Sequence, residues 1–461
     1  MFAFYLLYIS LVNANAVIPS VFRNRLLRSV NQHGHGELVF AHAVWRHGDR
    51  MPDRDMPKFG VKWPLPTGEM SVLGMEQQFK LGEKLRTRYV ETEKLISPYF
   101  NSEEIYVRST DKNRTLQSAS ITMMGMYGPN VRKGTDVPDY SPWPAGFVAI
   151  PVHTVEYSTD YVANVNRKCP RLRKLLRTIY YETPEGRNIS MDPENKILFQ
   201  YLSEQSGKPI DMFNFWSIND YAMVSRIHNV SLSITEDSLF EQIQRIDDRI
   251  DRLQFGIGLQ PFKGVDLKLD MAKVRGSPML FEILERMNRK VFCRETEKEK
   301  MSDEQKDMCK RMDKLKFYAY SAHDMTISAL FAIFGFPAPN FDEIGLPCYS
   351  TAVTIELRRI NQKYVVRVLF WPANKDKFQD ITSHIKGCEG ECTLKQFNER
   401  AEIYRVDDIK ELCNTPLFPN STDKDSNDPN DPRIPVLSSG NLRSYSILVM
   451  ISAFLFNSFG L

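Results

Sequence analysis

Residues 37–52 read ELVFAHAVWRHGDRMP, and this stretch decides the fold of the chain. The first part, residues 37–45, is a largely apolar run that is typical of a buried strand. A polar and charged turn from Arg46 to Pro52 follows at once. Ligands of open α/β sheets bind beyond the carboxyl ends of strands, so this turn is a candidate ligand site.

Two further stretches repeat the order of strand and then charge. Residues 104–108 (EIYVR) predict a short strand, and a charged segment follows from Arg108 to Arg114. Residues 315–321 (LKFYAYS) predict another strand, which is followed by His323 and Asp324. Because ligand sites form where strands of one sheet end, we expect the three charged clusters to share one pocket.

Helices and strands alternate at both ends of the predicted globular body. Residues 72–92 show helical spacing, and the cap-type residues 109–111 predict a helix that runs to about Met126. Residues 352–358 and 364–371 alternate in polarity around a short polar turn, which predicts a hairpin. The pattern indicates a discontinuous α/β domain formed by 37–139 and 313–413.

The middle of the chain has a different character. Residues 140–312 combine helical patterns with irregular stretches that contain Trp and Pro, followed by a strongly charged segment. We interpret this region as a mainly helical cap that is inserted into the α/β domain.

Composition excludes two broad classes. Lys and Arg number 60 against 57 Asp and Glu, which leaves a net charge of only +3, and 42% of the residues are hydrophobic. This balance excludes a chain built around nucleic acid or another polyanion, and it excludes a wholly disordered protein. No internal repeat is visible, so a solenoid is not expected.

The three clusters contain the groups needed to hydrolyse a phosphate monoester without a metal ion. Arginine forks bind phosphate oxygens bidentately. A neutral imidazole can attack phosphorus when the phosphoryl charge is neutralised around it. A carboxylic acid can protonate the departing alcohol.

The turn also carries a family resemblance. Arg46-His47-Gly48-Asp49-Arg50-Met51-Pro52 matches the RHGxRxP signature of the histidine acid phosphatases. The chain resembles the prostatic and lysosomal branch of that family over roughly 37–413, in segments that include LGMEQ at 73–77, RSTD at 108–111, PVHTV at 151–155 and YSAHD at 320–324. The resemblance implies an α/β fold whose mixed central sheet is flanked by helices, as in phosphoglycerate mutase, with an inserted mainly helical cap domain.

The resemblance also implies roles for individual residues. His47 would be the nucleophile and become phosphohistidine, and Asp324 would donate the proton to the leaving alcohol. The phosphate-binding residues would be Arg46, Arg50, Arg114 and His323. No cofactor and no metal ion are expected, and the expected partners are small phosphomonoester substrates. The branch forms homodimers, which the sequence leaves open for this chain.

The roles of Asp324 and His47 lead to a hypothesis about the pH dependence of activity. Asp324 must be protonated to act as an acid, and a neighbouring phosphate dianion would raise its pKa. His47 must be neutral, and the arginines beside it would lower its pKa. Both shifts favour activity in mildly acidic conditions.

Seven cysteines allow several pairings. Cys388 with Cys392 and Cys293 with Cys309 form natural short loops, and the odd count leaves one thiol over. A zinc site is not expected, because only His384 lies near Cys388. The resemblance implies bonds Cys388–Cys392 and Cys169–Cys413. A third bridge of the family is missing, because Val224 stands at one of its cysteine positions. We pair Cys293 with Cys309, which leaves Cys348 free.

Both ends of the chain point to the secretory pathway. Residues 1–16 are predicted to be a signal peptide with its apolar run at 2–12. Residues 414–443 are expected to form a disordered stalk, and 444–461 a hydrophobic tail. The tail is interpreted as a glycosylphosphatidylinositol signal, with a transmembrane helix as the alternative. It would be the only membrane attachment, and the site would lie at the cell surface or in a secreted or lysosomal lumen.

Four glycosylation sequons are present. Asn188, Asn229 and Asn420 are predicted to carry glycans. Asn113 is expected to stay bare, because a glycan there would crowd Arg114.

Several interpretations stay open. Other functions are a narrower phosphatase of the same fold, such as a phytase or a lysophospholipid phosphatase, and a catalytically silent surface-binding homologue. A phosphoglycerate mutase-type transfer shares the arginine and histidine chemistry but does not fit the secretory features. Arg108 and His153 are expected to be structural, whereas Trp45 and Trp63 could line a leaving-group site or belong to the core.

Overall fold

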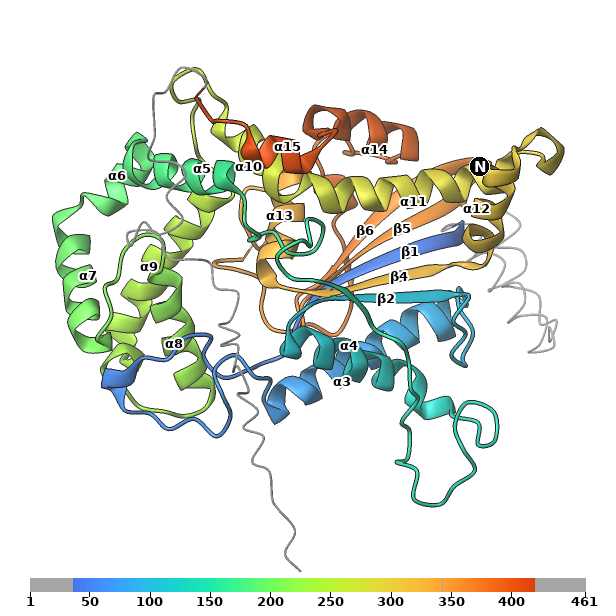
Figure 1. The fold of residues 1–461 in the computed structure, drawn as a ribbon, viewed down its shortest axis with the longest axis horizontal. Helices are drawn as coiled ribbons and strands as arrows, with labels where there is room; N and C mark the ends of the chain where they lie inside the picture. Colours follow the sequence, from blue (N-terminus) through green and yellow to red (C-terminus); the bar gives the residue numbers. More distant parts are fainter. Residues whose placement is uncertain (1–35, 342, 419–461) are drawn as a thin grey trace, which may run out of the picture.

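The computed structural model describes residues 36–341 and 343–418. One mixed sheet with the strand order β3-β2-β4-β1-β5-β6-β7 forms the centre of the molecule (Figure 1). Its strands are β1 (Glu37–Arg46), β2 (Ile105–Thr110), β3 (His153–Val155), β4 (Phe317–Ala322), β5 (Ala352–Ile360), β6 (Lys363–Trp371) and β7 (Gln379–Asp380). The mixed sheet flanked by helices confirms the predicted fold class.

The expected site strands are neighbours in this sheet. β2, β4 and β1 lie side by side and run parallel. Nine of the ten residues of β1 are buried, as its apolar sequence predicts for a central strand covered on both faces. β5 and β6 form the predicted antiparallel hairpin, and its turn residues Asn361 and Gln362 have positive φ values of 47° and 67°. Such turns match the twist of paired strands.

Helices cover both faces of the sheet. On one face lie α3 (Val72–Arg86) and α4 (Asn113–Tyr127), whose apolar sides share a core with Trp45. On the other face lie α11 (Ser277–Glu295) and α13 (Asp324–Phe334). The helices α12 (Asp303–Lys314) and α14 (Leu394–Ala401) complete the sheet domain. The last helix, α15 (Ile409–Asn414), packs against the helical group described next, where Cys413 is buried and bonded to Cys169.

A helical group stands at the end of the sheet where the parallel strands finish (Figure 1). It consists of α5 (Pro170–Tyr181), α6 (Pro184–Ser190), α7 (Pro193–Ser206), α8 (Phe215–Ile227), α9 (Asp237–Gln254) and α10 (Leu267–Arg275). These helices surround a hydrophobic core of their own. We call this group the helical cap.

The expected cap boundaries, 140–312, differ from this arrangement at both ends. β3 pairs with β2 at the sheet edge, and α11 packs into the core beneath the sheet. A strand of three residues is too short for a periodic signal. The apolar side of α11 fits a helix on either core, so its spacing does not reveal its partner.

Candidate active site

The three charged clusters meet at the carboxyl ends of the parallel strands. Arg46 is the last residue of β1, Ala322 the last of β4 and Thr110 the last of β2. The backbone N–H of His47 donates to the carbonyl of Ala322 (3.1 Å), which ties the first cluster to the third. The rings of His47 and His323 lie 5.5 Å apart between centroids. The clusters therefore share one site, as the strand pattern predicts.

His47 is buried and held in one tautomer. Its Nδ1 lies 2.8 Å from the carbonyl oxygen of Gly48. A carbonyl can only accept, so Nδ1 carries the hydrogen and Nε2 keeps a free lone pair. Gly48 is required here, because a Cβ on it would lie 2.3 Å from the carbonyl oxygen of Gly74 at the start of α3.

Each of the three expected arginines forms an ion pair with one aspartate. The pairs are Arg46 with Asp324 (2.8 Å), Arg50 with Asp220 (2.9 Å) and Arg114 with Asp53 (3.0 Å). Burial lowers the pKa of His47 well below its ordinary value, and Arg114, Arg46 and Arg50 lower it further. The imidazole is therefore neutral.

His323 is a second buried and neutral histidine. Burial, followed by the positive charge of Arg114, lowers its pKa to about 3. Its Nε2 lies 3.0 Å from the hydroxyl of Thr110 at the end of β2. The hydroxyl of Thr115 donates to the carbonyl of Thr110 (2.8 Å) and fixes this turn.

Asp324 is the first residue of α13. One carboxylate oxygen accepts the backbone N–H of Met325 (2.6 Å), and the other accepts from Arg46. Its side chain keeps 18% exposure, more than the 10% of Arg46. The carboxylate is therefore more exposed to solvent than the guanidinium with which it pairs.

Asp220 is a site residue that the sequence did not reveal. It lies on α8 of the cap, where it accepts from Arg50 and from the backbone N–H of Asp53 (2.8 Å). An aspartate on a remote helix has no motif around it, and only the fold brings it to Arg50.

Asp49 makes a second connection between cap and motif. It is fully buried, and its Oδ2 accepts from Ser71 Oγ (2.5 Å) and contacts His228 Nε2 (2.8 Å). His228 follows α8 directly. The variable position of the RHGxRxP motif thus links the start of α3 to the cap.

Arg108 and His153 contact residues that the sequence analysis did not assign to the site. Arg108 pairs with Asp160 (2.6 Å) and, at 3.4 Å, with Glu282. His153 lies on β3 and stacks on the ring of Tyr106 at a centroid distance of 4.3 Å. Both are structural contacts, as expected.

The two tryptophans belong to hydrophobic packing. Trp45 is fully buried in the core beneath α3 and α4. Trp63 packs against the cap core, and its Nε1 donates to the hydroxyl of Tyr221 (3.2 Å).

The cysteines pair as the sequence analysis expected. Disulfides join Cys169 to Cys413, Cys293 to Cys309 and Cys388 to Cys392. Cys348 has a free thiol.

Asn188 and Asn229 are exposed on the surface of the cap. Asn420, the predicted signal peptide, the predicted hydrophobic tail and nearly all of the expected stalk lie outside the described residues. Among the described helices, none is both long and apolar enough to cross a membrane.

No trio of His, Cys, Asp or Glu within the described ranges is arranged to hold a metal ion.

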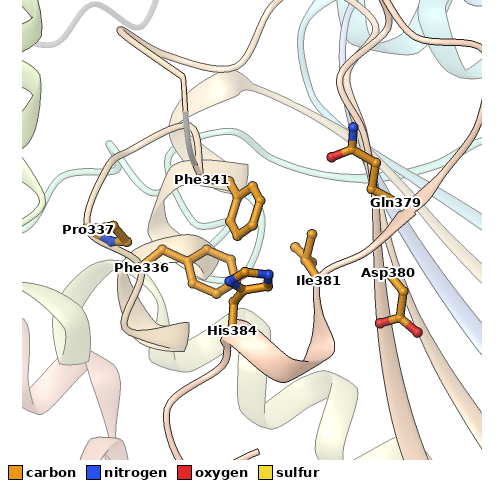
Figure 2. A pocket seen from close by; sticks show the side chains of 7 residues that line it. All are labelled: Phe336, Pro337, Phe341, Gln379, Asp380, Ile381 and His384. Atoms are coloured by element: carbon orange, nitrogen blue, oxygen red, sulfur yellow. The ribbon is translucent and has the colours of Figure 1, made fainter. Parts of the chain in front are cut away.

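A separate hollow of about 430 Å³ lies at the β7 edge (Figure 2). It is lined by Phe336, Pro337, Phe341, Gln379, Asp380, Ile381 and His384. None of the residues expected in the catalytic site lines this hollow.

Comparison with known proteins identifies the class. Residues 37–371 match the histidine phosphatase superfamily (branch 2), and the chain belongs to this family. Membership places it among the phosphomonoester hydrolases and confirms the resemblance seen in the sequence.

Particular relatives cover most of the chain. A Caenorhabditis elegans protein from the acid phosphatase series of that nematode is 29% identical over 416 residues, covering 85% of this chain and 97% of its own. Human prostatic acid phosphatase is 28% identical over 380 residues, covering 79% and 84%. Among solved structures, a Citrobacter braakii phytase superposes with a TM-score of 0.54 at 14% identity, covering 82% of this chain and 99% of its own. That likeness shows the shared fold.

Proposed function

We propose that the chain is an acid phosphatase that hydrolyses phosphate monoesters through a phosphohistidine formed on His47. One observation carries the proposal: a buried neutral imidazole, with its Nε2 lone pair free, lies within the field of three arginines from two strand ends. Cations around a neutral nucleophile stabilise the negative charge of a phosphoryl group as it is transferred.

The phosphate would be held by Arg46, Arg50, Arg114 and His323. Arginine binds phosphate through planar pairs of N–H donors. A neutral His323 can donate to phosphate only from its Nδ1. The hydroxyl of Thr110 carries one hydrogen and lies 2.9 Å from Thr115 Oγ1 and 3.0 Å from His323 Nε2. The phosphate-binding tautomer therefore requires this hydrogen to turn from Thr115 to Nε2.

The reaction would take two steps. Nε2 of His47 attacks phosphorus, the bond from phosphorus to the alcohol oxygen breaks, and Asp324 gives its proton to that oxygen. Water then attacks phosphorus, its proton passes to the Asp324 carboxylate, and the bond from phosphorus to Nε2 breaks. Inorganic phosphate leaves, and His47 and Asp324 return to their starting states.

The acid preference follows from both groups. His47 stays neutral in acid because burial and arginines lower its pKa. Asp324 works as a donor only while it is protonated. The rate should therefore fall as pH rises, and a rate that stays flat from about pH 4 to 8 would contradict this assignment.

The test is hydrolysis of an aryl phosphate at mildly acidic pH without added metal. Replacing His47→Ala should lower kcat by roughly 10³-fold or more. Replacing Asp324→Asn should cost roughly 10²-fold with a poor leaving group and much less with a good one. His384→Ala, at the separate hollow, is the matched control and should keep full activity. A His47→Ala enzyme as active as the parent would refute the proposal.

We also propose that the protein acts in the secretory pathway, at the cell surface or in a secreted or lysosomal lumen. Three disulfides within the described residues suit an oxidising compartment. The apolar segment at 2–12 supports the same placement.

A further inference from the structure

Tyr349 lies against three groups of the site at once. It precedes β5, and its ring centroid is 4.2 Å from Cζ of Arg46 and 6.0 Å from Cζ of Arg50. The ring of His47 lies 5.8 Å away between centroids. The side chain is buried, and burial raises its pKa to about 12, so the phenol stays neutral where the enzyme would work.

The backbone around Tyr349 is tied to the motif on both sides. On one side, the carbonyl of Pro347 accepts from Nη1 of Arg46 (2.6 Å). On the other side, the backbone N–H of Ser350 donates to the carbonyl of His47 (3.2 Å). Gln78, fully buried on α3, donates to both the Arg46 carbonyl (3.0 Å) and the Ser350 hydroxyl (2.7 Å).

Ser350 has a positive φ of 62°, which non-glycine residues rarely adopt. Such a conformation persists only where surrounding contacts hold it, and it is found preferentially at functional sites. The backbone on both sides of Tyr349 is therefore held by contacts with the motif and with α3.

An aromatic ring attracts the Arg46 guanidinium whether or not the neighbouring carboxyl group is ionised. The charged partner of Arg46 is Asp324, which must be protonated, and hence neutral, when it donates its proton. The ion pair with Arg46 is then absent. A π face still attracts the guanidinium without neutralising it and leaves its N–H donors free for phosphate.

We propose that Tyr349 is a positioning residue, which holds the guanidinium groups of Arg46 and Arg50 in their phosphate-binding orientation. This inference rests on the proposed function of the site. In this role Tyr349 acts through the two arginines and not directly on the phosphoryl group.

The test measures KM, kcat and the inhibition constant for inorganic phosphate in the full chain. Replacing Tyr349→Leu should raise KM and the phosphate inhibition constant about tenfold, because two buried cation–π contacts are lost. The change in kcat should be smaller than the change in KM. Tyr349→Phe keeps the π face and should recover most of the loss.

A graded series separates positioning from simple packing. Phenylalanines with one, two and three ring fluorines placed at position 349 keep the shape of the ring but weaken its π face stepwise. The phosphate inhibition constant should rise with each fluorine. This series also serves if the leucine variant does not fold.

Two kinds of failure can be told apart. If the parent enzyme hydrolyses an aryl phosphate and loses activity with His47→Ala, the proposed function stands. A phosphate inhibition constant that is unchanged across the fluorinated series would then overturn the role of Tyr349 alone. A parent enzyme without a histidine-dependent reaction would overturn both.

Discussion

Asn113 and Arg114 are neighbours at the start of α4, and a glycan on the first would crowd the second. Asn113 is exposed, but its side chain donates to Glu69 (2.8 Å). Thr115, the hydroxyl residue of this sequon, is fully buried, and its hydroxyl donates to the Thr110 carbonyl. The hydroxyl of the sequon is therefore engaged in the fold.

We predict that Asn113 carries no glycan when the full chain is expressed through a eukaryotic secretory pathway. Glycopeptide mass spectrometry on the full chain measures this directly, with the exposed Asn188 and Asn229 as internal positive controls. Full occupancy at Asn113 in an active enzyme would contradict the assignment of Arg114 to phosphate.

Single residues show where sequence reasoning reaches its limit. The charged residues that follow strands were predictable, because a motif and a strand end mark them. Asp220 and Tyr349 were not predicted, since each reaches Arg50 from an element remote in sequence. Their roles come from tertiary proximity, which no local pattern encodes.

At the scale of elements, α3 and α4 approach closely through two glycines. A Cβ on Gly82 would lie 2.1 Å from the carbonyl oxygen of Thr122, and one on Gly125 would lie 2.2 Å from that of Phe79. Both contacts are with backbone, which cannot rotate away. The position of α3 matters for the RHGxRxP motif, because Ser71, the N-cap residue of this helix, donates to Asp49 of the motif.

Replacing Gly82→Ala should push α3 away from α4 and lower the free energy of unfolding by about 1–3 kcal/mol. Urea unfolding of the full chain measures this. Gly390→Ala is the matched control, because a Cβ at that position meets no atom within 4 Å. An equal effect of both substitutions would show that the close helix contact is unimportant.

Elements with strong local patterns were predicted well. The buried strand β1, the helix α4 and the β5–β6 hairpin all lie where the sequence placed them. The assignment of β3 and α11 to the cap differed from the structure. Short edge strands and helices with an ambiguous apolar face depend on their partners more than on their own sequence.

At the scale of the whole molecule, two sets of buried titratable groups change the free energy of unfolding with pH in opposite directions. Burial lowers the pKa of His42, His47 and His323. Burial also raises the pKa of Asp247 to about 7 and that of Asp251 well above its ordinary value. Both aspartates lie on α9 of the cap.

The signs follow from proton binding. Below about pH 6.5 the unfolded chain protonates these three histidines while the folded chain keeps them neutral, so their contribution to stability is lost as pH falls. The folded chain keeps the proton of Asp247 up to about pH 7, and the pKa of Asp251 is raised in the same direction. Their contribution is therefore fully present below about pH 4, and that of Asp247 is lost as pH rises toward 7.

The double variant Asp247→Asn and Asp251→Asn isolates the second effect. The quantity to measure is the free energy of unfolding of the variant minus that of the parent. This difference should be larger at pH 7.5 than at pH 4.5 by more than about 1.4 kcal/mol, the value of one pKa unit. Urea unfolding at both pH values checks this. A difference between variant and parent that is the same at both pH values would refute the raised pKa of the pair.

The central claim is that the phosphoryl group of the substrate is transferred to His47 before water releases it. Trapping the phosphoenzyme tests this claim most directly. The full chain would be mixed with a radiolabelled aryl phosphate, quenched in alkali and digested. We predict a label on the His47 peptide that survives alkali, is released by acid and is absent from the His47→Ala variant. An acid-stable label, or a label that persists in His47→Ala, would contradict the account.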